Sequence, residues 1–285
     1  MSPRVLQGDA LALLPAERAA SFDLVFADPP YHLSNGGTTC KNGKRAPVRK
    51  GAWDRSAGIS SDLTFHRSWI LAVQRVLKPS GTLWVSGTSH SIFLCGFALQ
   101  EMGWSILNTV TWFKPNAAPN LSCRTFAHSS ELLIWAAPPR VGKKLLHRFD
   151  YRGMKRENGG KQMRDLWPLP GPSSTWAIPT TPASEKKHGG HPTQKPEALL
   201  ERIIRCSTRK GAVILDPFCG SGTTAVVAAR LGRSYLAIDR EARWADLTNR
   251  RIDEVWFRAE ERAAAEIAAG FAKKARRTVP FWRVG

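Results

Sequence analysis

Short apolar runs that end in an acidic residue dominate the hydrophobic pattern of this chain. Runs of this length, rich in branched and aromatic residues, predict strands that are buried on both faces, as in a parallel sheet. Open parallel sheets bind ligands beyond the carboxyl ends of their strands, so each terminal aspartate is a candidate site residue. The three runs and their aspartates are Phe22–Ala27 with Asp28, Val213–Leu215 with Asp216, and Tyr235–Ile238 with Asp239.

Helical periodicity fills the intervals between these runs. The spacing of apolar residues predicts helices over Leu63–Leu77, Pro196–Cys206, Thr223–Leu231 and Glu241 to about Ala269. Further strands are predicted at Thr82–Ser86, Ile106–Trp112 and Leu132–Trp135, the later ones antiparallel or at the sheet edge. We expect the first helix to end in a turn at Lys78–Gly81. This alternation predicts an α/β fold with a doubly wound, mostly parallel sheet.

The charge balance favours a polyanionic partner. Lysine and arginine number 42 against 23 aspartates and glutamates, which gives a formal net charge of +19. Neutralising phosphates releases condensed counterions, so this excess is typical of nucleic-acid-binding proteins. A basic surface that serves only solubility has the same composition and stays an alternative.

Cysteine spacing and hydropathy limit the class further. The five cysteines form no closely spaced pair, which argues against a zinc site or a disulfide framework; they are Cys40, Cys95, Cys123, Cys206 and Cys219. No apolar run approaches the roughly 18 residues of a membrane span, and Met1–Arg4 leads into no apolar signal core. We therefore expect a soluble protein of the reducing cytoplasm without a metal site.

Two basic segments do not fit the pattern of alternating strands and helices. Residues 32–58 combine glycines with a basic cluster at residues 41–50, and residues 138–191 are rich in proline and glycine. Nine lysines and arginines lie in residues 140–164, against Asp150 and Glu157. Either segment fits a mobile surface loop, but together they favour DNA-contacting loops beside the active-site edge. The basic cluster of the first segment consists of Lys41, Lys44, Arg45, Arg49 and Lys50.

The tetrapeptide Asp28-Pro29-Pro30-Tyr31 suits chemistry on an aromatic amine. Such an amine is a poor nucleophile because its lone pair is delocalised into the ring. The Asp28 carboxylate and the Pro29 carbonyl can accept its two N–H bonds and localise the lone pair, with the prolines fixing the backbone. Tyr31 can stack on a base that is rotated out of the duplex. The alternative interpretation is a simple turn, since Asp-Pro-Pro ends any strand or helix.

A glycine turn between a strand and a helix is the second motif. Its glycines let the backbone approach an adenosyl or methionine moiety, and the absence of a lysine excludes a phosphate loop. Asp239 follows the next strand, where it can accept ribose hydroxyl protons or simply cap a helix. His191–Pro196 precedes another helix, whose first amides and hydroxyls can bind a carboxylate. The candidate residues in the glycine turn are Asp216, Phe218, Cys219, Gly220, Ser221, Gly222 and Thr223.

The ordered set of motifs resembles the amino-methyltransferases of DNA, in particular their circularly permuted beta class. The resemblance runs from about Val5 to about Ile252, with the catalytic tetrapeptide first and the glycine motif last. It implies a Rossmann-like domain that uses S-adenosylmethionine. One departure is Ala237, which stands where relatives carry glycine before the ribose acid. The other matching segments are Gly8–Leu11, Leu77–Leu83, Trp112–Asn116, Ser129–Glu131 and His191–Pro196.

The resemblance implies a role for each site residue. Asp28, Pro29, Pro30 and Tyr31 would hold the target base. The cofactor would be bound by Asp9, His191, Thr193, Lys195, Asp216, Phe218, Cys219, Gly220, Ser221, Gly222, Thr223 and Asp239. The catalytic domain is expected at residues 1–137 and 188–270, a target-recognition insertion at 138–187, and a basic tail at 271–285.

The expected activity is site-specific methylation of adenine N6 in double-stranded DNA by base flipping and direct displacement. Family members that act on cytosine N4 usually begin the tetrapeptide with serine, so Asp28 favours adenine. Cytosine N4, an RNA or protein amine, and a non-catalytic DNA-binding module are the alternatives. A homodimer and a cognate restriction endonuclease are open as further partners.

Overall fold

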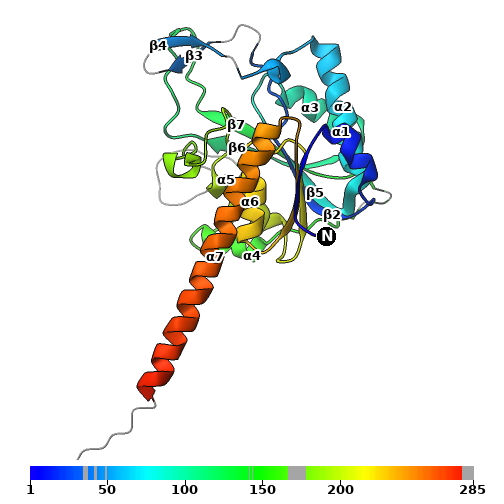
Figure 1. Ribbon diagram of the computed structural model, residues 1–285. Helices are drawn as coiled ribbons and strands as arrows, with labels where there is room; N and C mark the ends of the chain where they lie inside the picture. Colours follow the sequence, from blue (N-terminus) through cyan, green and yellow to red (C-terminus); the bar gives the residue numbers. More distant parts are fainter. Residues whose placement is uncertain are drawn as a thin grey trace, which may run out of the picture.

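A seven-stranded sheet forms the centre of the molecule, and its strand order is β1-β9-β8-β2-β5-β7-β6 (Figure 1). The computed structural model describes residues 1–277 except 35–37, 42–43, 49, 141, 143 and 166–177. Neighbours from β1 to β5 pair in parallel, and β7 pairs antiparallel with both β5 and β6. The strands are β1 (Arg4–Gln7), β2 (Phe22–Ala27), β5 (Leu77–Gly87), β6 (Ser105–Phe113), β7 (Ser130–Ala137), β8 (Val213–Asp216) and β9 (Ser234–Asp239). This arrangement confirms the predicted α/β fold with a mostly parallel sheet.

Helices cover both faces of the sheet, as a doubly wound fold requires. One face carries α1 (Ala10–Leu13), α2 (Ile59–Val76) and α3 (Ile92–Glu101), and the other carries α5 (Glu197–Ser207), α6 (Thr223–Arg230) and α7 (Ala242–Arg277). The short helix α4 (Tyr151–Glu157) packs on α5. Strands β3 (Thr38–Lys41) and β4 (Lys44–Pro47) form a separate hairpin, and three single 3₁₀ turns lie at Leu14–Ala16, Ala52–Asp54 and Ala183–Lys186.

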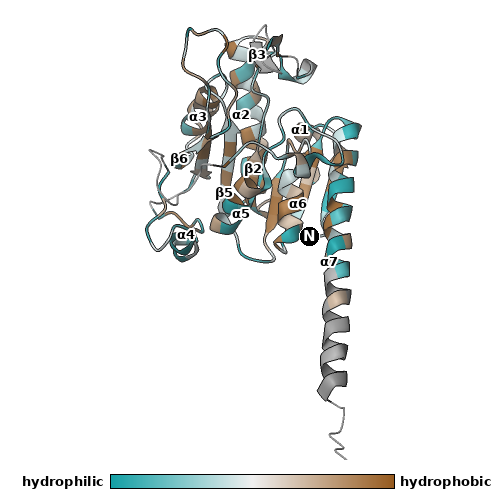
Figure 2. Cartoon of the chain, turned by 90° about the vertical axis from the view of Figure 1, so that its left-hand side faces the viewer, coloured by the Kyte–Doolittle hydropathy of each residue, from teal (hydrophilic) through white to brown (hydrophobic). Residues whose placement is uncertain are grey.

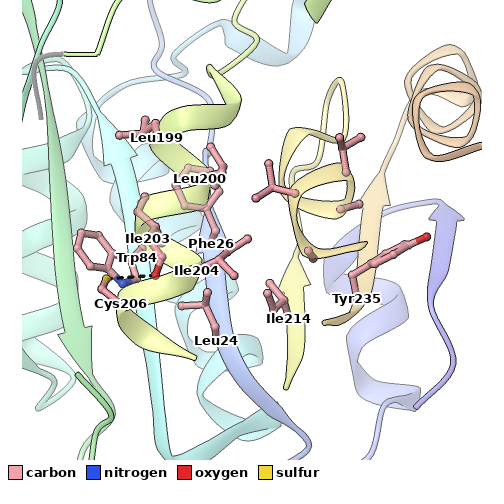
Figure 3. Packing of buried hydrophobic residues seen from close by; sticks show 14 of the residues in the cluster. Leu24, Phe26, Trp84, Leu199, Leu200, Ile203, Ile204, Cys206, Ile214 and Tyr235 are labelled. Carbon is pink, nitrogen blue, oxygen red and sulfur yellow. Dashed lines mark hydrogen bonds between the residues drawn. The ribbon is translucent and has the colours of Figure 1, made fainter. Parts of the chain in front are cut away.

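Alternation along the strands divides the core into two clusters. Leu24 and Phe26 of β2 face α5 and α6, whereas Val25 and Ala27 of the same strand face α2 and α3. Figure 3 shows part of the first cluster. One of its members, Trp84, also donates its indole N–H to the hydroxyl of Ser207, a polar residue outside the cluster, at 2.9 Å. Hydrophobic residues concentrate on the strands and on the helix faces turned toward them (Figure 2). The central strands are therefore buried on both sides and are held in a fixed register.

Three local features differ from the predictions. Lys78–Gly81, expected as a turn before a strand, lies inside β5 as a bulge, because Phe22 pairs with Leu77 and Leu24 pairs with Thr82. Helix α2 begins at Ile59, four residues before the predicted start, and α3 has no predicted counterpart. Helix α3 is apolar on nearly all sides, so its sequence shows no helical periodicity.

Strand direction places Lys50 of the first basic segment and α4 of the second at opposite edges of the sheet. The first segment contributes Lys50 to the carboxyl edge, whereas α4 of the second contacts the last turn of α5, which leads into the start of β8. There the Asp150 amide donates to the Cys206 carbonyl at 2.8 Å. The expectation that both segments border the active-site edge is therefore wrong for the described residues around α4. Arg49 of the first segment lies outside the described residues.

The C-terminal helix leaves the carboxyl edge and extends past the opposite end of the body (Figure 1). It continues to Arg277, eight residues beyond the predicted end, so residues 271–277 of the expected basic tail are helical. Residues 278–285 lie outside the described part of the chain. Within the described part, no helix has the length and apolar character needed to cross a membrane.

Candidate active site

A cavity of about 820 Å³ opens at the carboxyl edge of the parallel strands. Every predicted site residue except Gly222 lines it, and a volume of this size suits a cofactor together with a substrate group. The ends of β1, β9, β8 and β2 supply the four aspartates Asp9, Asp239, Asp216 and Asp28. Further lining side chains that no sequence motif predicted include His32, Trp53, Asp54, Phe65 and Trp244.

The Asp28 carboxylate lies at the centre of a polar network. Its Oδ1 accepts hydrogen bonds from the Tyr31 hydroxyl at 2.7 Å and the Ser86 hydroxyl at 2.5 Å. Its Oδ2 accepts from the Lys195 ammonium at 2.6 Å. A carboxylate has about four acceptor positions, so the described donors leave one for a substrate N–H. The carboxylate is thus fixed in orientation and retains capacity for the chemistry predicted for it.

A second partly buried carboxylate, Glu131, adjoins the first. The Tyr31 hydroxyl lies 3.0 Å from its Oε2, the Lys114 ammonium lies 3.2 Å from its Oε1, and Lys195 lies 3.6 Å from its Oε2. Burial alone would raise the pKa of Glu131, but Lys195 and Lys114 outweigh it and lower the pKa. Burial likewise opposes the charge of Lys195, yet Asp28 and Glu131 raise its pKa. Both ionised partners are thereby stabilised together.

Two lysine ammonium groups lie over the Tyr31 ring in this structure. The Lys195 and Lys50 ammonium nitrogens lie 5.0 and 5.5 Å from its centre, at cation–π distances. The ring is buried, and burial raises the pKa of its hydroxyl well above the usual value. Burial also lowers the pKa of Lys50, although Asp54 opposes this effect. A base can stack on Tyr31 only after the Lys50 side chain moves.

Asp54 anchors the backbone that follows the tetrapeptide. Its fully buried carboxylate accepts from the Tyr31 amide at 3.1 Å, the Leu33 amide at 3.2 Å and the Ser34 hydroxyl at 2.8 Å. His32, between these donors, adopts a left-handed conformation with φ 58°. A lone aspartate in a segment of glycines and cations carries no motif, so the sequence did not reveal this role.

The glycine turn brings the cofactor-side residues together. The Gly220 amide donates to Asp239 Oδ2 at 2.9 Å, which fixes the turn at the end of β9. Gly222 has φ 72°, and a Cβ there would lie 2.3 Å from the Thr248 side chain on α7. Gly222 therefore serves the packing of the turn on α7 and does not line the cavity. Cys219 and Ser221 are almost fully buried in the same turn.

Asp216 is a buried acid with few partners. Its carboxylate accepts from the Thr224 hydroxyl at 2.5 Å and the Phe218 amide at 3.1 Å. Burial raises its pKa to about 7, and burial also raises the pKa of Asp239. A cationic or hydrogen-bond-donating ligand stabilises the ionised form of such an acid, because it replaces the interactions with water that the carboxylate loses on burial. An amino-acid ammonium and ribose hydroxyls meet this requirement.

The His191–Pro196 segment differs in detail from the expectation. The Lys195 ammonium, expected on the cofactor, is bound to Asp28 and Glu131. The first helical amide of α5, that of Glu197, donates to the Glu185 carboxylate at 3.0 Å. The His191 ring stacks on Trp53 with centres 6.2 Å apart and meets Trp244 edge-on at 4.4 Å. Burial lowers its pKa to about 4, so this ring is neutral at physiological pH.

These features fit S-adenosylmethionine on the glycine side of the cavity. Asp239 and Asp9 stand at the ends of adjacent strands, where they can receive a ribose and an adenine. Phe218 offers an apolar surface that rests on Phe65 and Trp69 at ring distances of 6.0 and 5.8 Å. The described residues contain no group of three or more histidine, cysteine or acidic side chains placed to hold a metal ion.

Comparison with known proteins identifies the family. Residues 22–250 match the family model described as DNA methylase. The chain is 46% identical over 250 residues to the Type II methyltransferase M2.LlaDCHI of Lactococcus lactis subsp. cremoris, covering 88% of this chain and 89% of the relative.

Solved structures agree with this assignment at the level of the fold. The PvuII cytosine-N4-specific DNA methyltransferase superposes with a TM-score of 0.66 at 18% identity, over 90% of this chain and 92% of that one. The M1.HpyAVI complex with S-adenosylmethionine superposes with a TM-score of 0.58 at 20% identity, over 87% and 98%. The chain therefore belongs to the beta-class DNA methylases, enzymes that transfer a methyl group from S-adenosylmethionine to an amino group of a DNA base.

Proposed function

We propose that this enzyme methylates the N6 amine of adenine at a specific sequence in double-stranded DNA. The observation that carries the proposal is Asp28, which lines the cavity and is held by three donors with one acceptor position left. A carboxylate at this position accepts an amine N–H more strongly than the serine hydroxyl that begins the tetrapeptide in most cytosine-specific members. The fold alone does not distinguish adenine from cytosine.

Asp28 and the Pro29 carbonyl would each accept one N–H of the target amine. Drawing both protons into fixed hydrogen bonds localises the nitrogen lone pair and aims it at the methyl group. S-adenosylmethionine supplies that methyl group in an activated, cationic form. Once the amine is methylated and positively charged, it loses a proton, and Asp28 is the carboxylate placed to accept it. The Lys195 ammonium keeps Asp28 ionised for this step.

Tyr31 would stack on the adenine after the base leaves the duplex. The Tyr31 hydroxyl is held by Asp28 and Glu131, so the plane of the ring is fixed before the base arrives. Lys50 lies over that ring in this structure and must give way to the base. Its ammonium would then be available to a backbone phosphate, which compensates for the lost cation–π contact.

Cofactor binding would rest on the aspartates at the strand ends. We assign the amino-acid ammonium to Asp216, the ribose hydroxyls to Asp239 and the adenine to Asp9 and Phe218. Gly220, Cys219, Ser221 and Thr223 form the wall of this part of the cavity, and His191 and Thr193 close it from the side of Trp53. Lys195, in contrast, pairs with the carboxylates of Asp28 and Glu131 on the catalytic side of the cavity.

Target recognition would lie at the carboxyl edge, because only segments there can reach a flipped base and its neighbours. The candidates are the β3–β4 hairpin, the loop between β6 and β7, and the later part of the expected insertion around Thr180, whose amide bonds Asn116 at 3.0 Å. The Type II name of the relative further suggests a restriction endonuclease with the same recognition sequence as a partner.

The proposal is tested by identifying the methylated nucleoside. Purified enzyme is incubated with unmodified genomic DNA and S-adenosylmethionine, and the digested product is analysed by mass spectrometry. N6-methyladenine supports the proposal, and sequencing of the same product gives the recognition site. N4-methylcytosine would contradict the argument from Asp28, and a product without any methylated base would contradict the proposed reaction.

A further inference from the structure

Phe126 is almost completely exposed on a loop at the active-site edge. Its side chain is 96% exposed, the largest fraction among the large hydrophobic residues of the described chain. The loop spans residues 114–129 and joins β6 to β7. Because β6 runs parallel to β5 and β2, the end of β6 at Phe113 lies on the same edge as Asp28. Exposing an entire phenyl ring to water is unfavourable, so a partner that covers it would gain affinity.

The base of this loop contacts the catalytic network directly. The Lys114 amide donates to the Ser129 carbonyl at 2.7 Å, which closes the loop, and the Lys114 ammonium lies 3.2 Å from Glu131. Glu131 in turn bonds the hydroxyl of Tyr31 at 3.0 Å. Phe126 is three residues from Ser129, so its backbone is within about 10 Å of the loop base. The ring therefore lies within reach of DNA whose target base occupies the cavity.

Hydrogen bonds hold the loop in one conformation. The Asn120 side chain donates to the Thr125 carbonyl at 2.8 Å and accepts from the Ser122 amide at 2.9 Å. Close to the end of β6, the Asn116 side-chain amide donates to the Thr180 hydroxyl at 3.0 Å. A loop ordered in this way presents Phe126 at a defined position, which lowers the entropic cost of its contact with a partner.

The charges beside Phe126 fit a DNA backbone. Arg124 and His128 stand two residues to either side and are both exposed, and residues 114–129 contain no aspartate or glutamate. An apolar ring beside a cation and a further hydrogen-bond donor is an arrangement with which proteins insert a wedge between stacked bases while binding the adjacent phosphates. If the partner covering Phe126 were an apolar protein segment, the loop could carry acidic residues without loss of affinity. The absence of acidic residues therefore favours DNA as the partner.

We propose that Phe126 inserts into the duplex and occupies the space that the target adenine leaves when it enters the cavity. The ring restores stacking for the bases next to the gap and offsets the cost of unstacking the target. Arg124 binds the phosphate backbone beside the gap. This inference rests on the proposed base-flipping reaction and assigns to one residue the stabilisation of the flipped state.

The test compares Phe126→Ala with the unaltered enzyme on two substrates that carry the recognition sequence. In one duplex the target adenine is paired with thymine, and in the other it faces an abasic site, which lowers the cost of flipping. We expect Phe126→Ala to lower kcat/KM by about 10- to 100-fold on the paired duplex, corresponding to the loss of one stacking contact. On the abasic duplex we expect a change of less than threefold.

A direct readout of flipping accompanies the kinetics. With 2-aminopurine in place of the target adenine, the unaltered enzyme should raise its fluorescence on binding, and Phe126→Ala should not. Phe257→Ala on α7, 61% exposed and distant from the carboxyl edge, is the matched control and should behave like the unaltered enzyme.

Two results would overturn the inference: an equal loss on both duplexes, or no loss on the paired duplex. Either result leaves the proposed function standing if the unaltered enzyme still forms N6-methyladenine. Failure of the unaltered enzyme on both duplexes would instead contradict the proposed function.

Discussion

Buried Lys195 joins two partly buried carboxylates that would otherwise repel each other. Its ammonium bonds Asp28 at 2.6 Å and lies 3.6 Å from Glu131, and its side chain is 6% exposed. Removing one partner from a buried ionic group leaves an uncompensated charge, which typically costs 3–5 kcal/mol. The contribution of Lys195 is therefore to hold the catalytic carboxylate ionised and in place.

Replacing Lys195 with methionine should lower both stability and transfer. We expect Lys195→Met to reduce the free energy of unfolding by about 3 kcal/mol, because Asp28 and Glu131 lose their shared cation. Transfer to DNA should fall at least about 100-fold, while Lys195→Arg should recover part of it. Urea denaturation and single-turnover kinetics measure the two effects. A stable Lys195→Met enzyme with normal kinetics would show that this ion pair has no functional role.

Asp216 makes stability depend on pH between about 4 and 7. Burial raises its pKa from 3.8 in the unfolded chain to about 7 in the folded protein. Between these values the folded state binds more protons than the unfolded state, so its contribution to stability is largest below pH 4 and is lost as pH rises to about 7. Asp216→Asn should remove on the order of 4 kcal/mol of this pH dependence.

Cofactor affinity should also change as Asp216 titrates, but it should rise with pH where the stability contribution of Asp216 falls. A cationic ammonium prefers the ionised Asp216, so S-adenosylmethionine should bind more tightly as pH rises through about 7. Isothermal titration calorimetry across pH 5.5–8.5 measures this trend, and Asp216→Asn should flatten it. The exposed aspartate Asp253 on α7 gives the control Asp253→Asn, which should keep the trend. An affinity that stays constant with pH in the unaltered enzyme would argue against Asp216 as the ammonium ligand.

At the scale of elements, the turn between β8 and α6 depends on its contact with α7. Gly222→Ala places a Cβ 2.3 Å from Thr248 at φ 72°, whereas Gly159→Ala has a similar φ of 61° and meets no atom within 4 Å. Both variants carry the strain of a left-handed residue, about 1–3 kcal/mol, but only Gly222→Ala adds a clash. We expect it to be less stable than Gly159→Ala by roughly 2 kcal/mol in denaturant titrations. Equal stability of the two would contradict the packing role assigned to Gly222.

Most strands and helices were predictable because their sequence period matches their environment. Central strands such as Phe22–Ala27 are continuous apolar runs, and α5 alternates polar and apolar residues with helical spacing. Helix α3 was missed because it is apolar on nearly all sides, and the Lys78–Gly81 bulge resembles a turn in sequence. Tertiary pairing with β2, which no local pattern encodes, makes that bulge part of a strand.

Site residues within a local sequence motif could be predicted, whereas contacts between residues far apart in the sequence could not. The tetrapeptide and the glycine turn are local, so their positions followed from sequence. The ion pair of Lys195 with Asp28 joins residues 167 positions apart, and Asp54 acts on Tyr31 from 23 positions away. Such contacts depend on chain topology, which a single sequence constrains only through the order of its elements.

Over the whole molecule, the positive charge is divided between two edges. The loop with Arg124 lies at the carboxyl edge with the cavity, whereas Lys155 and Arg156 of α4 lie at the opposite edge, where α5 ends. Helix α7, about 54 Å long at 1.5 Å per residue, also leads away from the cavity. DNA bound for catalysis therefore contacts only part of the net charge of +19.

This division predicts different effects for cations at the two edges. Arg124→Ala should raise KM for DNA and reduce the slope of log affinity against log salt concentration by about 1, because one phosphate contact is lost. The double variant Lys155→Ala, Arg156→Ala should leave kcat and KM for a short duplex within about twofold of the unaltered enzyme. Salt-dependent binding and steady-state kinetics on that duplex measure both. A large KM increase in the α4 variant would place the DNA path across the opposite edge.

The most direct test of the catalytic assignment is methyl transfer by Asp28→Ala. The variant keeps Lys195 paired with Glu131, so the fold and the cofactor side of the cavity should remain intact. We expect S-adenosylmethionine affinity to stay within about threefold, while transfer to DNA in a single turnover falls at least about 100-fold. Near-normal transfer by Asp28→Ala would contradict the account, because the amine would then be activated without this carboxylate.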